Sequence, residues 1–156
     1  LPYFAMVAAW YEAVGTGVEG GVLQELVDGM LAAADMAAAL NPGHLIHIEE
    51  WLHSPVNPGS EAQLRSGMLI QCDIIPVVAP EYHTVNAEDT IALADEQLRG
   101  EIRVEYPAMW ARIEARREFM REALGIELRP EVLPFSGPPA VVRPFTLAPN
   151  RVLRVG

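Results

Sequence analysis

Apolar residues recur at helical spacing in two segments at the start of the chain. Between residues 2 and 14 they fall on one side of a helix: Phe4, Val7, Ala8, Tyr11 and Val14. Between residues 20 and 39 a second set does the same: Val22, Leu23, Leu26, Val27, Met30 and Leu31. Gly15-Thr-Gly17 separates the two helices, and Asn41-Pro-Gly43 predicts a stop and a turn after the second.

The next three apolar segments are typical of strands. Leu45, Ile48 and Leu52 mark the first, and the mostly apolar run Met68–Val78, which ends before Pro80, predicts a buried second strand. The third is predicted over residues 90–94, entered through Asn86-Ala-Glu-Asp89. We expect a mainly antiparallel, three-stranded sheet.

Helical patterns return after the strands and give way to proline. One helix is predicted from Asp95 to about residue 102, and Pro107 suits the first turn of a long helix with Gly125 as its C-terminal cap. Beyond Arg129 the chain is rich in proline, and we expect an extended tail that packs over the domain and adds edge strands. The order of elements predicts an α+β fold, with a domain over residues 1–128 and a proline-rich extension over 129–156.

Composition narrows the classes of function. The 156 residues suffice for one domain, and no apolar run reaches the roughly 18 residues that cross a bilayer. Acidic residues outnumber basic ones by 21 to 11, which argues against a nucleic-acid partner. The single cysteine, Cys72, fits a reducing compartment, and with no basic leader at the start we expect a cytoplasmic protein. The chain begins at Leu1 rather than Met, so we expect a processed or partial chain.

Polar residues that interrupt the strands are the candidates for chemistry. His44 follows the Pro-Gly turn, Asp73 lies inside an apolar run, and Glu88 opens the third strand. A buried carboxylate is costly unless it is paired or binds a metal. One imidazole and two carboxylates on neighbouring strands form a ligand set for Mn²⁺, Co²⁺, Zn²⁺ or Fe²⁺.

The order of short motifs resembles the second half of the pita-bread metallopeptidases, which include methionine aminopeptidase, aminopeptidase P, prolidase and the non-peptidase creatinase. The matching pieces are Gly43-His44, His53-Ser-Pro55, Leu64-Arg-Ser-Gly67-Met68, Asp73 and Glu88-Asp89-Thr-Ile91. The resemblance covers residues 1 to about 95, because two helices also precede the Gly-His strand in the family. It implies a metal-dependent hydrolase that acts on a peptide or another small-molecule substrate.

The resemblance also implies roles. His44, Asp73 and Glu88 match residues that bind the metal in the family. Asp73 also matches the carboxylate that transfers a proton. His53 matches the histidine that contacts the substrate and the tetrahedral intermediate. The segment between His44 and His53 is two residues longer than in the family, so His47 is a second candidate for the substrate contact. Asp73 stands where the family has a glutamate, one methylene longer.

Two readings of function therefore stay open. The family's other two ligands are aspartates on a hairpin upstream of the helices seen here, which favours either a partial hydrolase or a non-catalytic domain that binds a small molecule or a partner protein. Because the family's fold has two similar halves, we expect a homodimer or association with a first-half domain. The alternative for His47 is that it packs or bonds locally on its strand. Glu49 and Glu50 are expected to face solvent, Trp51 to lie in the core or a pocket wall, and Cys72 to be a small buried apolar residue.

Overall fold

A computed structural model describes residues 2–46, 53–79, 86–145 and 147–156. Two helices come first, α1 (Pro2–Ala13) and α2 (Gly20–Ala32), and are followed by five strands. These are β1 (Ala37–Ala38), β2 (Gly43–Leu45), β3 (Leu69–Ile74), β4 (Pro76–Val77) and β5 (Ala87–Leu93). Then come α3 (Glu96–Glu105), α4 (Pro107–Phe119), the π-helical turn η1 (Met120–Leu124) and β6 (Val132–Pro134).

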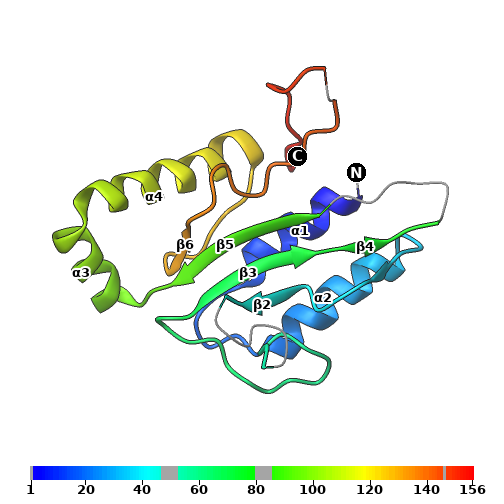
Figure 1. Cartoon of the computed structure of the whole chain (residues 1–156), viewed down its shortest axis with the longest axis horizontal. Helices are drawn as coiled ribbons and strands as arrows, with labels where there is room; N and C mark the ends of the chain where they lie inside the picture. The colour runs from blue at the N-terminus through cyan, green and yellow to red at the C-terminus, as the bar shows by residue number, and fades with distance from the viewer. Residues whose placement is uncertain (1, 47–52, 80–85, 146) are drawn as a thin grey trace.

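The main sheet has the strand order β2-β3-β5-β6, with every neighbouring pair antiparallel. Helices α1 and α2 cover one face of it, and α3 and α4 lie on the other side, beside β5 and β6 (Figure 1). The predicted α+β class and the antiparallel sheet are confirmed. β3 and β5 match the second and third predicted strands. Of the first predicted strand the structure describes β2, which ends at Leu45, and Ile48 and Leu52 lie outside the described residues. The proline-rich segment contributes β6 at the edge next to β5.

The larger core lies between α1, α2 and the sheet. Trp10, Tyr11 and Leu23 of the helices are fully buried there, against Ile70 and Ile91 of the central strands. A smaller apolar cluster on the opposite face joins Ala92 and Leu133 to Ile113 of α4. Because α3 and α4 cover only that end of the second face, the other end is left for polar side chains.

Helix α2 is shorter than the sequence predicts. The prediction that it runs to residue 39 is wrong, because α2 ends at Ala32 and Asp35 takes a left-handed conformation with φ of 54°. Residues 37 and 38 form β1 and pair with β4. Alanine favours helix locally, but strand pairing over a longer distance decides this segment.

The predicted strand over residues 68–78 is divided. β3 ends at Ile74, and β4 begins two residues later, at Pro76. Between them the Ile75 carbonyl accepts a 2.9 Å hydrogen bond from the amide of Ala39, so the second part pairs with a different strand. The chain therefore leaves the main ladder at Ile74.

The start of α2 is in close contact with the segment that follows His53. The amides of Gly20 and Gly21 donate to the carbonyls of Ala62 and Ser60, at 2.9 Å each. A β-carbon on Gly20 would lie 1.9 Å from the Pro55 carbonyl oxygen. Glycine is therefore needed because the two backbones meet here, and the contact satisfies amides that a helix start leaves unpaired.

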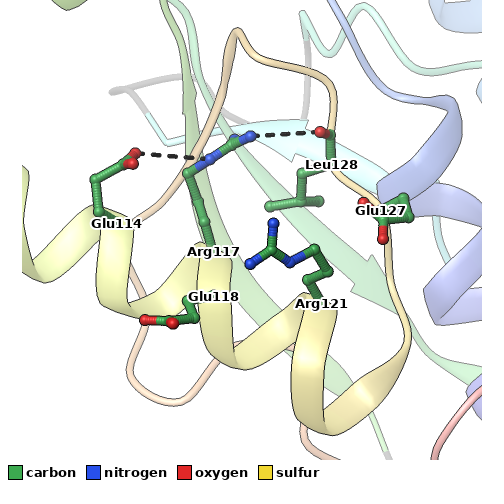
Figure 2. A pocket seen from close by; sticks show the side chains of 6 residues that line it. All are labelled: Glu114, Arg117, Glu118, Arg121, Glu127 and Leu128. Carbon is green, nitrogen blue, oxygen red and sulfur yellow. Dashed lines mark hydrogen bonds and ion pairs between the residues drawn. The ribbon is translucent and has the colours of Figure 1, made fainter.

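Arg117 connects α4 to the segment that leads into β6. Its guanidinium donates to the carbonyls of Leu128, at 3.4 Å, and Arg129, at 3.1 Å, and also to the Val132 carbonyl. Glu114, one turn earlier, lies 3.8 Å away from its Nε (Figure 2). The left-handed Gly125, with φ of 74°, ends η1 as the predicted cap and starts this segment.

Among the described residues, none of the helices is long and apolar enough to cross a membrane.

Candidate metal centre

Strand register brings the candidate ligands to one face of the sheet. His44 of β2 faces Gln71 of β3, and Asp73 of β3 faces Glu88 of β5. Side chains two residues apart on a strand share a face, so Gln71 and Asp73 point the same way. All four side chains therefore lie on the face opposite the larger core, beyond the end that α3 and α4 cover.

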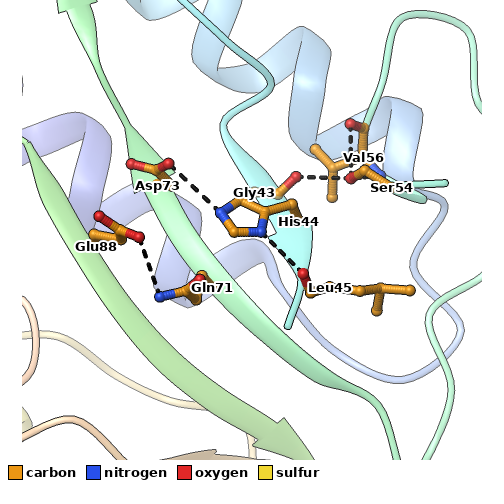
Figure 3. Close-up of polar contacts among 8 residues, drawn as sticks. All are labelled: Gly43, His44, Leu45, Ser54, Val56, Gln71, Asp73 and Glu88. Carbon is orange, nitrogen blue, oxygen red and sulfur yellow. Dashed lines mark hydrogen bonds and ion pairs between the residues drawn. The ribbon is translucent and has the colours of Figure 1, made fainter. Parts of the chain in front are cut away.

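The three predicted ligands converge. One ligand atom from each of His44, Asp73 and Glu88 lies within 4.8 Å of the other two. His44 and Asp73 are each 1% exposed, whereas Glu88 is exposed. Figure 3 shows the imidazole directed towards the Asp73 carboxylate, with Glu88 on the far side of β3. The site thus has a buried pair of ligands and a third ligand that reaches solvent.

A backbone contact fixes the tautomer of His44. Its Nδ1 lies 2.9 Å from the carbonyl oxygen of Leu45, and a carbonyl only accepts, so Nδ1 carries the hydrogen. In the neutral ring, Nε2 then presents its lone pair towards Asp73 Oδ2, 3.5 Å away. A carbonyl that holds the second ring nitrogen is the usual support of a metal-binding histidine.

Electrostatics at Asp73 favour a positive neighbour. Burial, and then the nearby Glu88 carboxylate, raise the pKa of Asp73, while the His44 and Asn86 side chains offset part of this rise. Within the described residues, Asp73 Oδ1 is buried and accepts no hydrogen bond. A cation between the two carboxylates and the imidazole would remove the repulsion between the carboxylates and satisfy that oxygen. The donor set and its spacing therefore fit a divalent cation of the borderline or hard type.

Of the two candidates for the substrate contact, the structure describes only His53. It is exposed and lies in a turn. The next residue, Ser54, is buried, and its hydroxyl donates to the Gly43 carbonyl at 2.9 Å, which ties this turn to the strand that carries His44 (Figure 3). His47 lies outside the described residues, as do Glu49, Glu50 and Trp51.

Two residues near the site were not predicted from the sequence. Gln71 donates to Glu88 Oε1 at 3.4 Å and lies on the same face as the ligands. Its position two residues before Asp73 was the signal, since strands alternate with a period of two. Tyr3 contacts the backbone beside both carboxylates, and no local pattern connects it to them, because the contact spans 71 residues of sequence to Ile74.

The fold and the site together define an α+β domain with a candidate metal centre on its antiparallel sheet. No family model matches the sequence, and no curated protein sequence matches it. Among solved structures, the chain is similar to a dipeptidase from Pyrococcus horikoshii OT3, with 20% identity and a TM-score of 0.46 over 58% of this chain and 27% of that one. It is also similar to a prolidase from Thermococcus sibiricus, with 20% identity and a TM-score of 0.49 over 60% of this chain and 27% of that one.

A methionine aminopeptidase from Thermotoga maritima is similar as well, with 14% identity and a TM-score of 0.44 over 59% of this chain and 45% of that one. These proteins are members of the pita-bread family that the sequence motifs resemble. The chain spans about a quarter of the length of the dipeptidase and the prolidase. Identities are low and TM-scores stay below 0.5, so the similarity assigns no function to this chain.

Proposed function

We propose that His44, Asp73 and Glu88 bind a divalent cation and that the chain is the metal-binding part of a hydrolase of the Xaa-Pro aminopeptidase or creatinase type. The single observation that carries the proposal is the convergence of three ligand atoms, from three neighbouring strands, within 4.8 Å of one another. An exposed acidic cluster is common without a metal, but here the imidazole and one carboxylate are 1% exposed. Buried groups of this kind call for a charged partner.

Each residue has a distinct part in this proposal. His44 would supply the neutral Nε2, oriented by the bond of its Nδ1–H to Leu45. Asp73 and Glu88 would supply oxygen ligands, and Asp73 would also accept the proton of the attacking water and pass it to the leaving amine. When bound, Mn²⁺, Co²⁺, Zn²⁺ or Fe²⁺ lowers the pKa of a coordinated water and polarises a carbonyl oxygen.

Substrate contacts come from outside the strands. His53 would donate a hydrogen bond to the substrate from its exposed turn, held near β2 by the Ser54–Gly43 bond, and His47 is the second candidate for that contact. The ordered motifs from Gly43-His44 to Glu88-Asp89 support a peptide or another small-molecule substrate, and a peptide with a proline after its first residue is the first candidate. A reducing, cytoplasmic location is part of the same proposal, supported by Cys72, which is free and buried.

Metal binding is the first test. The purified chain, dialysed against Co²⁺ or Mn²⁺, should retain the cation, and His44→Gln should lose it. His53→Gln is the matched control, because it removes an imidazole that is not a proposed ligand and should leave the bound metal unchanged. Equal metal content in the wild type and His44→Gln would contradict the proposal.

Turnover is the second test, and it separates the two classes of function. The full-length gene product, loaded with Mn²⁺ or Co²⁺, should hydrolyse an Xaa-Pro peptide, and His53→Gln should lower this activity while it keeps its metal. Metal retention without turnover of such peptides would support the metal site and contradict the proposed hydrolase activity.

A non-catalytic domain is the second candidate, and one contact favours it. His44 Nε2 and Asp73 Oδ2 already lie 3.5 Å apart and both residues are buried, as in a structural ion pair that needs no metal. Such a domain would use the same face of the sheet to bind a small molecule or a partner protein. Turnover of an Xaa-Pro peptide that depends on His44 would exclude it.

A further inference from the structure

The hydroxyl of Tyr3 forms a bridge between the two central strands. It donates to the carbonyl of Ile74 on β3 at 2.9 Å and accepts from the amide of Ala87 on β5 at 2.5 Å. Ile74 and Ala87 face each other in the ladder. A tyrosine hydroxyl has one hydrogen to give and can accept another, so a single side chain from α1 serves both strands.

This bridge is next to the candidate metal centre. Asp73 precedes Ile74, Glu88 follows Ala87, and the two carboxylate residues face each other as the neighbouring pair of the ladder. Tyr3 itself approaches from the opposite face, where α1 packs on the sheet (Figure 1). It therefore contacts the backbone of the site without lying in it.

The bridge also stands where the ladder ends. β3 stops at Ile74, and Pro76, which has no amide hydrogen, begins the strand that pairs with β1 instead. Ala87 is the first residue of β5. A terminal pair has a neighbouring pair on one side only and opens more easily than pairs in the middle. The Tyr3 hydroxyl adds a connection between β3 and β5 at this end of the ladder.

Tyr3 is suited to hold this connection. The residues next to it on α1, including Phe4 and Val7, belong to the larger core and fix the start of the helix. Burial raises the pKa of Tyr3 well above its ordinary value of 10.0, so the hydroxyl keeps its hydrogen and continues to donate to Ile74.

We propose that Tyr3 is a positioning residue for the metal centre: its hydroxyl sets the separation of β3 and β5 at Ile74 and Ala87, and thereby the separation of the Asp73 and Glu88 carboxylates. This inference rests on the proposed function of those carboxylates as ligands. It assigns to a buried side chain on the core side of the sheet a part in cation affinity.

Tyr3→Phe removes the hydroxyl and keeps the ring, and Val7→Ala is the control. Val7 is fully buried on the same helix, so its truncation weakens the core without removing a hydrogen bond to β3 or β5. Two measurements apply to each variant: amide hydrogen exchange with backbone chemical shifts by NMR, and Co²⁺ affinity from its visible absorption in a titration.

In Tyr3→Phe we expect protection of the Ala87 amide to fall by about five-fold or more, while Ile91 in the middle of β5 changes no more than in Val7→Ala. The amide shifts of Asp73 and Glu88 should move, and Co²⁺ should bind about ten-fold more weakly, as for other groups that orient metal ligands. Val7→Ala, compared under conditions where it is folded, should keep the Co²⁺ affinity of the wild type.

Unchanged protection of Ala87 would overturn the bridge. Lost protection with unmoved shifts of Asp73 and Glu88, or with unchanged Co²⁺ affinity, would overturn the positioning role and leave the proposed metal centre intact. If the wild type itself takes up no Co²⁺, the proposed function fails, and the shifts of Asp73 and Glu88 still decide whether Tyr3 positions them.

Discussion

Two glycines of α2 should respond in opposite directions to the same substitution. Gly20 is buried at the first position of the helix, and Gly29 is exposed in its last turns. A β-carbon on Gly29 meets nothing within 4 Å. Alanine is favoured over glycine inside a helix by about 1 kcal/mol, so Gly29→Ala should raise the free energy of unfolding by that amount.

Gly20→Ala should have the opposite sign. Its β-carbon would lie 1.9 Å from the Pro55 carbonyl oxygen, and a backbone atom cannot move aside as a side chain can. Overpacking costs about 1–3 kcal/mol. Displacement of the segment also weakens the Gly20–Ala62 and Gly21–Ser60 hydrogen bonds, each worth about 0.5–1.5 kcal/mol. The helical gain of about 1 kcal/mol offsets only part of this, so we expect a net loss of about 3 kcal/mol.

Urea unfolding, followed by circular dichroism and tryptophan fluorescence, measures both variants. The midpoints should shift in opposite directions at a constant slope, because neither change alters the surface exposed on unfolding. A Gly20→Ala protein as stable as the wild type, with its slope unchanged, would show that the contact between α2 and the Pro55 segment is not as close as described.

Three further predictions concern the α4 contact, the α3 cap and assembly. Arg117→Lys should lower the free energy of unfolding by about 1–3 kcal/mol in the same urea assay, because lysine cannot reproduce the guanidinium fork that reaches several carbonyls. Arg121→Lys is the control: this side chain is 55% exposed, and its replacement should change the free energy of unfolding by less than about 0.5 kcal/mol. Asp95 caps α3 by accepting from the Leu98 amide, and this bond holds the pKa of Asp95 below its ordinary 3.8. Its carboxylate therefore stabilises the fold above pH 3.8 and loses that effect as the pH falls further. The difference between the urea midpoints of the wild type and Asp95→Ala should shrink in acid. A difference that stays constant with pH would contradict a cap that depends on the charge of Asp95. Sedimentation velocity at micromolar concentration should show a homodimer, and a monodisperse monomer without a first-half partner would contradict that expectation.

The fold was predictable where local pattern and tertiary structure agree. α1 and β3 were both predicted from the spacing of their apolar residues. A helix buried on one face has apolar residues at helical spacing, whereas a strand buried on two faces has a continuous apolar run. The alanines near residue 37 led to the wrong prediction that α2 continues to residue 39, since their preference for helix is weak and pairing with β4 outweighs it. β6 has three residues in a segment with prolines, too few for its pairing with β5 to be read locally.

The three candidate ligands could be predicted from the sequence, but their neighbour Tyr3 could not. His44, Asp73 and Glu88 were identified by their contrast with apolar neighbours and by motif order, and strand register then brings them together. Tyr3 was not, because its contacts with Ile74 and Ala87 cross 71 and 84 residues of sequence. A side chain that acts through backbone atoms of distant strands leaves no pattern of its own in the sequence.

The separation of the two sheet faces has a consequence for engineering. The candidate ligands project from the face opposite the larger core, so their replacement changes few of the contacts that hold α1 and α2 to the sheet. Glu88, the exposed member, is the natural position at which to exchange the oxygen donor for the nitrogen or sulfur donors that other metals prefer. A panel of Glu88→His, Glu88→Cys and Glu88→Gln proteins could therefore be screened for altered metal selectivity on an unchanged scaffold.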